Sequence, residues 1–302
     1  MTLAFSIATH NRLPELQRTL ANLAALSPLP DEILVCADGC DDCTAQFVRE
    51  KFPRVILIEH ANPRGSIPSR TELMEAATSD IVVSLDDDSY PLDSDFVARV
   101  RELFAANPHI AVAGFPQRSE EFPQSLKQSD FGPSHYAATY SDSGVAYRRS
   151  VYKQLEGWPG EFVHAYEEPD YALQCLAAGH AIYYDTTLLI RHHFTNLKRN
   201  EIRTHHRHAR NEQWSAWRRC PFPDVLAVSP YRALSQLNYA RKRGLAWLVR
   251  EPAWWFSALA GLPAALAKRR PVAARIYRQW IRLARHPIAS REEWQAIFGK
   301  KS

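Results

Sequence analysis

Short apolar runs alternate with longer amphipathic segments over roughly the first third of the chain. Alternation of this kind is typical of βαβ units and predicts an α/β fold with a mostly parallel sheet. The predicted strands are residues 3–8, 32–37, 55–59, 81–85 and 110–115, and the predicted helices between them are residues 14–25, 44–51, 69–77 and 94–106.

The pattern changes near residue 200, after which only helices are predicted, over residues 231–243, 252–267 and 271–286. The last two have Pro at the favoured first helical position. We therefore predict a domain over residues 1–200 and a helical extension over residues 201–302. The 15-residue apolar run 253–267 would extend about 22 Å as a helix, too short for a bilayer core of about 30 Å, so we predict no transmembrane span.

Charge is distributed unevenly, although the 302 residues together carry only +4. Residues 1–197 contain 15 Lys and Arg against 27 Asp and Glu, a net of −12. Residues 198–302 contain 22 against 6, a net of +16, and seven of the eight tryptophans. The acidic part suits a cation, whereas the basic part suits phosphate or an anionic lipid surface. With 46% hydrophobic and 23% charged residues, disordered and fibrous classes are excluded.

Five cysteines are an odd number and do not indicate a disulfide framework. Cys40 and Cys43 form a CxxC, but without a second pair or a nearby His a zinc site is a weak interpretation. The apolar run 3–8 is too short for a signal-peptide core. We expect a cytoplasmic protein with reduced thiols.

Polar residues follow three of the predicted strands, at ends that a parallel sheet brings to one edge. The first strand is followed by Thr9, His10 and Arg12, the second by Asp38, and the fourth by 86–88, which is Asp-Asp-Asp. Neither a Walker A pattern nor a GxGxxG fingerprint is present. Clustered carboxylates repel one another unless a cation neutralises them, so Asp86 and Asp88 predict a Mg²⁺ or Mn²⁺ site. The alternative is a solvated turn that caps the next helix.

A second acidic cluster, Glu167, Glu168 and Asp170, opens an amphipathic helix. Acidic residues in a first helical turn are ordinary complements of the helix dipole. The aromatic residues Trp158 and Tyr166 just before them favour a functional interpretation, because apolar surroundings raise a carboxylate pKa and aromatic rings stack on a ring-shaped acceptor.

The order of these motifs resembles glycosyltransferase family 2. The resemblance covers about the first 195 residues: 6–12 (SIATHNR) is similar to the family's opening strand, 32–44 to its second strand and acidic turn, 62–70 to its Gly-containing stretch that ends in Arg, 85–88 (LDDD) to its DxD motif, 144–149 to its acceptor-side strand, and 167–171 (EEPDY) to its ED-containing helix start.

The resemblance implies a GT-A fold, with a nucleotide-sugar half over about residues 1–115 and an acceptor half over about 116–200. It implies that Asp86 faces the sugar nucleotide, that Asp88 binds the metal, and that His192 is a further metal ligand. Glu168 stands where the family has the catalytic Asp, so the base is Glu168, Glu167 or Asp170. The residues implied in binding the nucleotide sugar are Thr9, His10, Arg12, Asp38, Arg64, Arg70, Asp86 and Asp87.

Together these features predict a metal-dependent inverting glycosyltransferase, which the resemblance places in bacterial surface-polysaccharide assembly. An Asp at position 38 is compatible with a pyrimidine, which favours UDP or dTDP sugars. The acceptor is a hydroxyl of a glycan or a lipid-linked molecule. The alternatives are a nucleotidyltransferase that makes nucleotide sugars and a non-catalytic protein that binds sugar nucleotides or polysaccharide.

The extension predicts a membrane surface as a partner, at the inner face of the cell membrane. Within residues 271–286 the basic residues Arg275, Arg278, Arg282 and Arg285 fall on one helix face, and the apolar residues Ile276, Trp280 and Leu283 fall on the other. The alternative is that the tryptophans pack on the catalytic domain. No nucleic-acid-binding motif is recognised, and the acidic first part would repel phosphate chains, so nucleic acid is not predicted.

Overall fold

The computed structural model describes residues 1–141, 143–194 and 200–299. Its centre is an eight-stranded sheet in the order β3-β2-β1-β4-β9-β6-β10-β8. The strands are β1 (Leu3–Thr9), β2 (Glu32–Asp38), β3 (Ile56–His60), β4 (Ile81–Asp86), β6 (Ile110–Gly114), β8 (His135–Tyr136), β9 (Val145–Arg148) and β10 (Ala181–Tyr184). The predicted α/β fold is confirmed, and each predicted strand is present to within two residues at either end.

The four strands β3, β2, β1 and β4 are parallel, and β10 is parallel to β6, whereas β9 runs antiparallel between β4 and β6. Ala8 of β1 pairs with Cys36 of β2 and with Asp86 of β4. This register brings the residues that follow β1, β2 and β4 to one edge of the sheet, as the sequence predicted.

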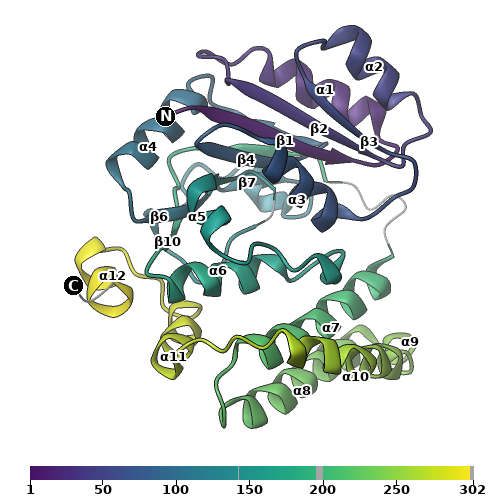
Figure 1. Cartoon of the computed structure of the whole chain (residues 1–302), viewed down its shortest axis with the longest axis vertical. Coiled ribbons are helices and arrows are strands. Elements are labelled where there is room, and N and C mark those ends of the chain that lie inside the picture. The colour runs from purple at the N-terminus through teal and green to yellow at the C-terminus, as the bar shows by residue number, and fades with distance from the viewer. Residues whose placement is uncertain (142, 195–199, 300–302) are drawn as a thin grey trace.

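Helices cover both faces of the sheet (Figure 1). Alternation along β1 explains the layers, because Leu3, Phe5 and Ile7 join one hydrophobic cluster and Ala4 joins the other. The helices of this part are α1 (Leu13–Leu23), α2 (Thr44–Lys51), α3 (Ser66–Ala76), α4 (Phe96–Ala106), α5 (Arg149–Gln154) and α6 (Glu167–Ala177), with short 3₁₀ turns at Pro123–Leu126 and Gly160–Phe162.

A second, three-stranded sheet lies beside the polar edge and consists of β5 (Ser89–Pro91), β11 (Ile190–His192) and β7 (Gln117–Ser119). In the antiparallel pair of β11 with β5, His192 stands opposite Ser89. The pairing therefore carries His192 back to the segment that directly follows Asp88.

The chain ends in helices only, and these lie beneath α6 and along one end of the sheet in Figure 1. They are α7 (Glu201–Arg219), α8 (Val225–Arg243), α9 (Leu245–Leu248), α10 (Glu251–Ala267), α11 (Ala274–Leu283) and α12 (Arg291–Phe298). No helix in the described part of the chain is long and apolar enough to cross a membrane.

The membrane interpretation of α11 was wrong. Ile276, Trp280 and Leu283 are buried in the same hydrophobic cluster as the sheet, and Trp280 Nε1 donates to Ala138 O at 2.9 Å. The helix begins at Ala274 and not at Pro271, because the N–H of Val272 is held by Arg219 O at 2.9 Å in an extended segment. The apolar stripe of α11 is therefore core, as the alternative stated.

Candidate functional site

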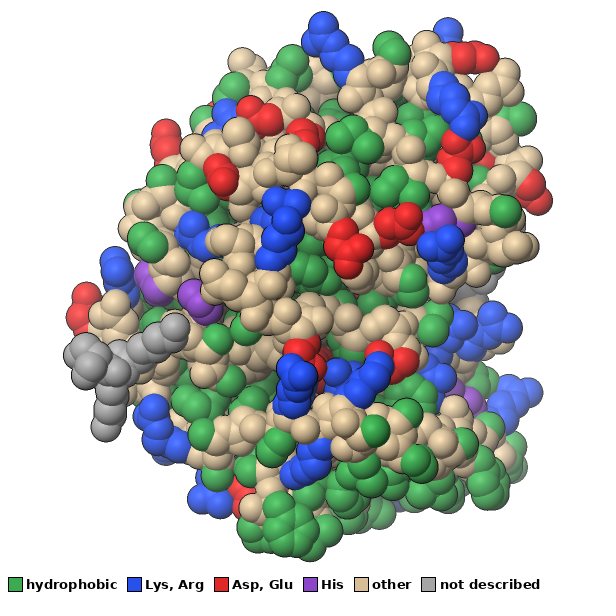
Figure 2. Space-filling view, viewed as in Figure 1, with side chains coloured by type: hydrophobic (Ala, Val, Ile, Leu, Met, Phe, Trp, Pro, Cys, Tyr) green, Lys and Arg blue, Asp and Glu red, His purple; other side chains and the backbone are tan. Residues whose placement is uncertain are grey.

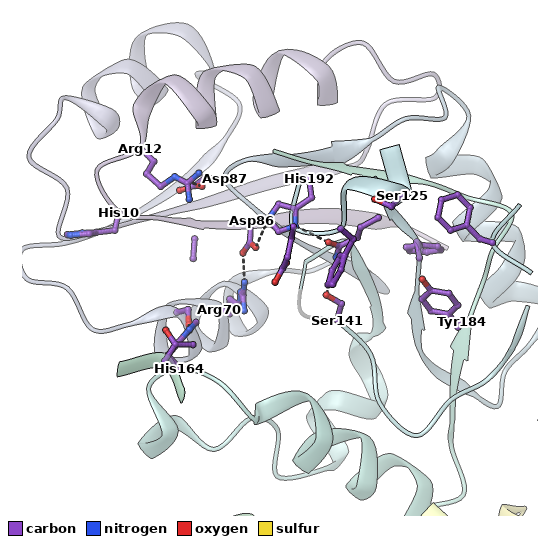
Figure 3. Close-up of a pocket in the computed structure, with 18 of the residues that line it drawn as sticks. His10, Arg12, Arg70, Asp86, Asp87, Ser125, Ser141, His164, Tyr184 and His192 are labelled. Atoms are coloured by element: carbon purple, nitrogen blue, oxygen red, sulfur yellow. Dashed lines mark hydrogen bonds and ion pairs between the residues drawn. The ribbon is translucent and has the colours of Figure 1, made fainter. Parts of the chain in front are cut away.

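A cavity of about 930 Å³ opens at the polar edge of the sheet. Its floor carries residues that follow β1 and β4, and its far wall comes from the segment after β6 (Figure 3). Ligands of open α/β sheets bind at this edge, beyond the carboxyl ends of the strands. The predicted site residues that line it are His10, Arg12, Arg70, Asp86, Asp87 and His192.

Asp86, Asp88 and His192 form a group whose possible ligand atoms all lie within 4.8 Å of one another. His192 Nε2 is 3.3 Å from Asp88 Oδ1 and 3.7 Å from Asp86 Oδ2. On the other side of the ring, Nδ1 lies 2.9 Å from the amide oxygen of Gln117, which turns Nε2 toward the carboxylates. Two carboxylates and one imidazole suit Mn²⁺ or Mg²⁺, so the donor set fits the predicted ion.

Two arginines neutralise these carboxylates from opposite sides. Arg12 Nη2 is 2.5 Å from Asp88 Oδ2 and Arg12 Nε is 3.2 Å from Asp87 Oδ1. Arg70 Nη2 donates to Asp86 Oδ1 at 2.6 Å. Burial opposes ionisation of Asp88, yet His192 and Arg12 hold the pKa of its carboxyl below the ordinary range. Asp88 is therefore an anion poised to bind a cation.

Asp87, like Asp88, is largely buried, although it lines the cavity. Its side chain is 6% exposed, and Thr9 Oγ1 donates to Asp87 Oδ2 at 2.7 Å. Burial raises the pKa of Asp87 to about 7, helped by the charges of Asp88 and Asp86 and opposed by Arg12. The hydroxyl of Thr9 therefore fixes the acidic turn.

Asp38 lines a second cavity of about 450 Å³, next to the first, together with Thr9, His10 and Arg64. Asp38 Oδ1 accepts from the backbone N–H of Arg64 and Oδ2 from that of Gly65, both at 2.8 Å. Burial alone would raise the pKa of Asp38, but these bonds and His60 lower it. Asp38 Oδ1 also contacts His60 Nδ1 at 2.7 Å, so the carboxylate holds the loop that forms the wall and only Oδ2 retains a lone pair for a ligand.

Of the acidic residues that open α6, Glu167 lies beside Arg70, which lines the cavity, and Asp170 does not. Glu167 Oε1 is 3.6 Å from Arg70 Nη1, so the start of α6 is linked through Arg70 to Asp86. Asp170 is fully buried, and it accepts hydrogen bonds from Arg219, Ser215 and Gln174. Because its charge is satisfied on the side of α7, Asp170 is structural and is removed from the candidate bases.

The predicted acceptor contacts Trp158 and Tyr166 are also corrected. Trp158 is 7% exposed and stacks among tyrosines, with Nε1 donating to Tyr140 Oη at 3.3 Å. Tyr166 is 6% exposed, with its hydroxyl bonded to Arg232 of α8. Neither ring reaches the described lining of the cavity, so both belong to the core that supports the loop before α6.

Sequence reasoning missed several residues that line the cavity on its acceptor side. Ser66 Oγ and His164 Nδ1 lie 3.0 Å apart across the cavity wall. Apart from Phe115, which directly follows β6, and Thr204 of α7, the rest stand on short strands and loops after residue 116, where the sequence pattern gave no signal. The missed residues other than Ser66 and His164 are Phe115, Gln117, Glu121, Phe122, Gln124, Ser125, Gln128, Phe131, Ser141, Tyr184 and Thr204.

Asn211 of α7 holds the loop that leads into α6. It is fully buried, and Nδ2 donates to the carbonyl oxygens of His164 at 2.9 Å and Ala165 at 2.8 Å. Val163, Ala165 and Tyr166 have positive φ angles of 65°, 73° and 71°. Backbone in this region needs support from its surroundings, so α7 contributes directly to the placement of Glu167 and Glu168.

Comparison with known proteins agrees with this geometry. The chain is 23% identical over 184 residues to the uncharacterized glycosyltransferase YwdF of Bacillus subtilis (strain 168), covering 58% of this chain and 68% of that protein. Its fold is similar to residues 1–349 of S. aureus TarS in complex with UDP-GlcNAc, with a TM-score of 0.62, 16% identity, and 89% and 84% of the two chains covered.

The fold is also similar to the mannosyltransferase PcManGT of Pyrobaculum calidifontis in complex with GDP-Man and Mn²⁺, with a TM-score of 0.58 and 19% identity over 94% of this chain and 84% of that chain. These likenesses confirm the GT-A fold. The family described as Glycosyl transferase family 2 matches residues 5–166, which is more than half of the chain. The protein therefore belongs to glycosyltransferase family 2 and is a glycosyltransferase.

Proposed function

We propose that this protein moves a sugar from a nucleoside diphosphate sugar to a hydroxyl group of a glycan or a lipid-linked acceptor, with inversion at the anomeric carbon. The observation that carries the proposal is the group Asp86, Asp88 and His192 at the strand end inside the large cavity. Two structural neighbours are complexes with a nucleotide sugar, one of them with Mn²⁺ as well.

Asp86, Asp88 and His192 would hold Mn²⁺ or Mg²⁺, and when bound this ion neutralises the charge that builds up on the departing diphosphate. The nucleoside would occupy the adjoining cavity of Thr9, His10, Asp38 and Arg64. We favour UDP or dTDP, since a carboxylate at position 38 accepts a hydrogen bond from a pyrimidine imide. Arg70, between Asp86 and Glu167, would orient the sugar side of the donor.

We assign the base to Glu168. Glu167 is 3% exposed and lies beside a guanidinium, an arrangement that stabilises its carboxylate as an anion and makes it a positioning residue. Glu168 is the next residue and is partly exposed. Its carboxylate would remove the proton of the acceptor hydroxyl while that oxygen attacks the anomeric carbon from the face opposite the diphosphate. Attack from this face inverts the anomeric centre.

We also propose that the protein works at a membrane surface. Large apolar side chains remain exposed on α9 and α10 and between them, namely Leu245 (73%), Val249 (64%), Phe256 (72%) and Leu259 (63%). Figure 2 shows hydrophobic side chains gathered over these helices, with basic side chains near them. We call these four residues the apolar face. An apolar face bordered by cations fits an anionic bilayer.

The transfer reaction is tested by thermal unfolding with UDP, dTDP or GDP, in Mn²⁺ and in EDTA. A ligand at a hundred times its dissociation constant stabilises by about 2.7 kcal/mol, a rise of roughly 5 °C for a domain of this size. We expect a Mn²⁺-dependent rise with one diphosphate, lost in Asp88→Asn and kept in the control Asp95→Asn, whose side chain is 60% exposed just before α4.

Stabilisation by a nucleoside triphosphate alone, with release of pyrophosphate, would instead indicate a nucleotidyltransferase. Stabilisation by a diphosphate sugar without turnover of any acceptor would indicate a binding protein. Inversion is checked by proton NMR of the glycoside formed from an α-linked donor. A β linkage is expected, and an α linkage would contradict single displacement.

A further inference from the structure

A cavity of about 450 Å³ lies between the first turns of α7 and α10, and four arginines are among the residues that line it. Arg203, Arg207 and Arg210 enter it from α7, and Arg250 enters it at the start of α10. His206 and Trp254 complete the wall. None of Asp86, Asp88, His192 or Asp38 lines this cavity. The proposed sugar transfer therefore does not by itself explain the cavity.

The positive charge of this cavity is not compensated within the described residues. No carboxylate there lies within 4.0 Å of the guanidinium groups of Arg203, Arg207, Arg210 or Arg250. Other arginines of the same extension are paired, for example Arg219 with Asp170 and Arg232 with Glu212. Burial and the neighbouring charge of Arg207 lower the pKa of Arg210, as expected for like charges held together.

Glu251, which directly follows Arg250, is already paired with other side chains. Glu251 is fully buried, with Oε1 2.8 Å from His205 Nε2 and Oε2 accepting from Trp254 Nε1 at 2.7 Å. His206 Nε2 is 3.9 Å from Glu251 Oε1, beyond hydrogen-bond distance. A cluster of cations that has no counter-ion among the described residues is typical of a site for an anionic ligand.

At least one of these guanidinium groups is held in place before any ligand arrives. Arg210 stacks 4.4 Å from the ring centre of Trp214, and its Nη2 donates to Phe162 O at 3.2 Å. Its Nε donates to Asn211 Oδ1 at 3.0 Å. Planar guanidinium groups bind phosphate through paired hydrogen bonds, and a fixed group loses little entropy in doing so.

The surroundings of the cavity indicate which kind of phosphate-bearing molecule would bind there. Arg203 and Arg207 also line the cavity of Asp38 and Arg64, so the cluster opens beside the proposed donor site. Along the chain, two residues of the cavity are neighbours of the apolar face, since Arg250 directly follows Val249 and Ser257 directly follows Phe256. A ligand placed here would meet guanidinium groups, and exposed apolar side chains come from the same segments of the chain.

We infer that the cavity of Arg203, Arg207, Arg210 and Arg250 binds a phosphate group carried on a lipid. In the reaction proposed above, this group is the phosphate that joins a lipid-linked acceptor to its hydrocarbon chain, so the inference rests on the proposed function. Phosphate binding would hold the acceptor beside the donor cavity while the apolar face contacts the bilayer.

The test is calorimetric titration of the full chain in EDTA with a soluble lipid phosphate, dihexanoyl phosphatidic acid, and separately with inorganic phosphate. We expect the lipid phosphate to bind at least tenfold more tightly. Arg250→Gln and Arg203→Gln should each weaken it about tenfold, the effect of one charge-assisted hydrogen bond. Arg282→Gln, which removes the same charge from the exposed side of α11, should leave binding unchanged.

Equal affinity for inorganic phosphate would overturn the lipid assignment, and an unchanged affinity in both cavity variants would overturn the site. Circular dichroism of each variant establishes that it is folded. The titration is repeated in Asp88→Asn, where the proposed metal group is disabled. Absence of Mn²⁺-dependent stabilisation by UDP in the wild type would count against the transfer function. Absence of lipid-phosphate binding would count against this inference, so the two failures are distinguishable.

Discussion

At the scale of single residues, the two glutamates that open α6 should respond differently to removal of charge. Glu168→Gln keeps the shape of the side chain but removes the proposed base, so kcat should fall by on the order of a hundredfold, while stabilisation by the donor is kept. Glu167→Gln removes the partner 3.6 Å from Arg70 and should weaken donor binding first. Rates measured with saturating donor separate the two effects, and full turnover by Glu168→Gln would move the base elsewhere.

Gly65 offers a second test at this scale because its backbone forms part of the proposed nucleoside pocket. Its φ is +105°, and a Cβ there would lie 2.7 Å from Val163 Cγ1 and 2.9 Å from Val163 O. Gly65→Ala should therefore lower the free energy of unfolding by about 1–3 kcal/mol and weaken UDP binding.

Gly132→Ala is the matched control for Gly65→Ala. Gly132 has φ +74°, but nothing lies within 4 Å of its added Cβ. Only the conformational cost of about 1 kcal/mol is expected, with UDP binding intact. Urea unfolding and UDP titration of both variants check the comparison. Equal losses would show that the contact with Val163 is unimportant.

Site residues that were predicted because they follow a strand lie in or beside the cavity. Site residues that were predicted because they are aromatic do not. Asp86 and Asp88 stand at the end of β4, at the edge where strand ends of the parallel sheet meet, and the antiparallel pairing of β11 with β5 brings His192 to them. Trp158 and Tyr166 seemed available to an acceptor, yet tertiary packing buries them. Asp170 is held by Arg219, 49 residues later in the chain, a contact that local sequence does not reveal.

At the scale of elements, periodicity predicted the long helices and strands but not their partners. The stripe of Ile276, Trp280 and Leu283 correctly indicated an amphipathic helix, but the surface that it covers is protein. The three-stranded sheet was not predicted as a unit, because strands of three residues are too short for a periodic signal. Their pairing, which orients His192 and Gln117, is set by tertiary structure.

Docking of α12 on the sheet edge should make stability depend on pH. His109 lies in this contact, with Nε2 2.9 Å from Tyr136 Oη and its ring 5.4 Å from that of Trp294. Burial, with the charges of Arg291 and Arg148, lowers the pKa of His109 to about 4. In the unfolded chain a His takes up a proton near pH 6.5. The contribution of neutral His109 to the free energy of unfolding is therefore fully present above pH 6.5 and is lost as the pH falls toward 4.

Because the ring is partly exposed, we expect His109 to account for about 1–2 kcal/mol of the stability lost between pH 7 and pH 5. His109→Gln, which retains a hydrogen-bonding side chain, should lose correspondingly less over this interval. Between pH 7 and pH 8 the two proteins should change in parallel. Urea unfolding at the three pH values measures this, and identical losses down to pH 5 would exclude His109 as the source.

At the scale of the whole molecule, the division of charge indicates a direction of approach to a membrane. Residues 1–197 carry a net of −12 and residues 198–302 a net of +16, so an anionic bilayer attracts the extension and repels the sheet-bearing part. The apolar face lies on the attracted part, although α11 does not contribute to it. Orientation by charge would turn the arginine cavity toward the lipid surface and leave the donor cavity beside it.

This arrangement predicts which exposed apolar residues matter for flotation with vesicles of phosphatidylcholine and phosphatidylglycerol. Phe256→Ser with Leu259→Ser should reduce the bound fraction at least tenfold, because two large side chains lose their burial in the interface. Leu29→Ser with Leu92→Ser, where the side chains are 58% and 45% exposed on the acidic part, should have no effect. Binding of the wild type should also weaken with salt, since screening reduces the attraction of the basic extension. Equal loss in both pairs, or none in either, would contradict a membrane contact through the apolar face.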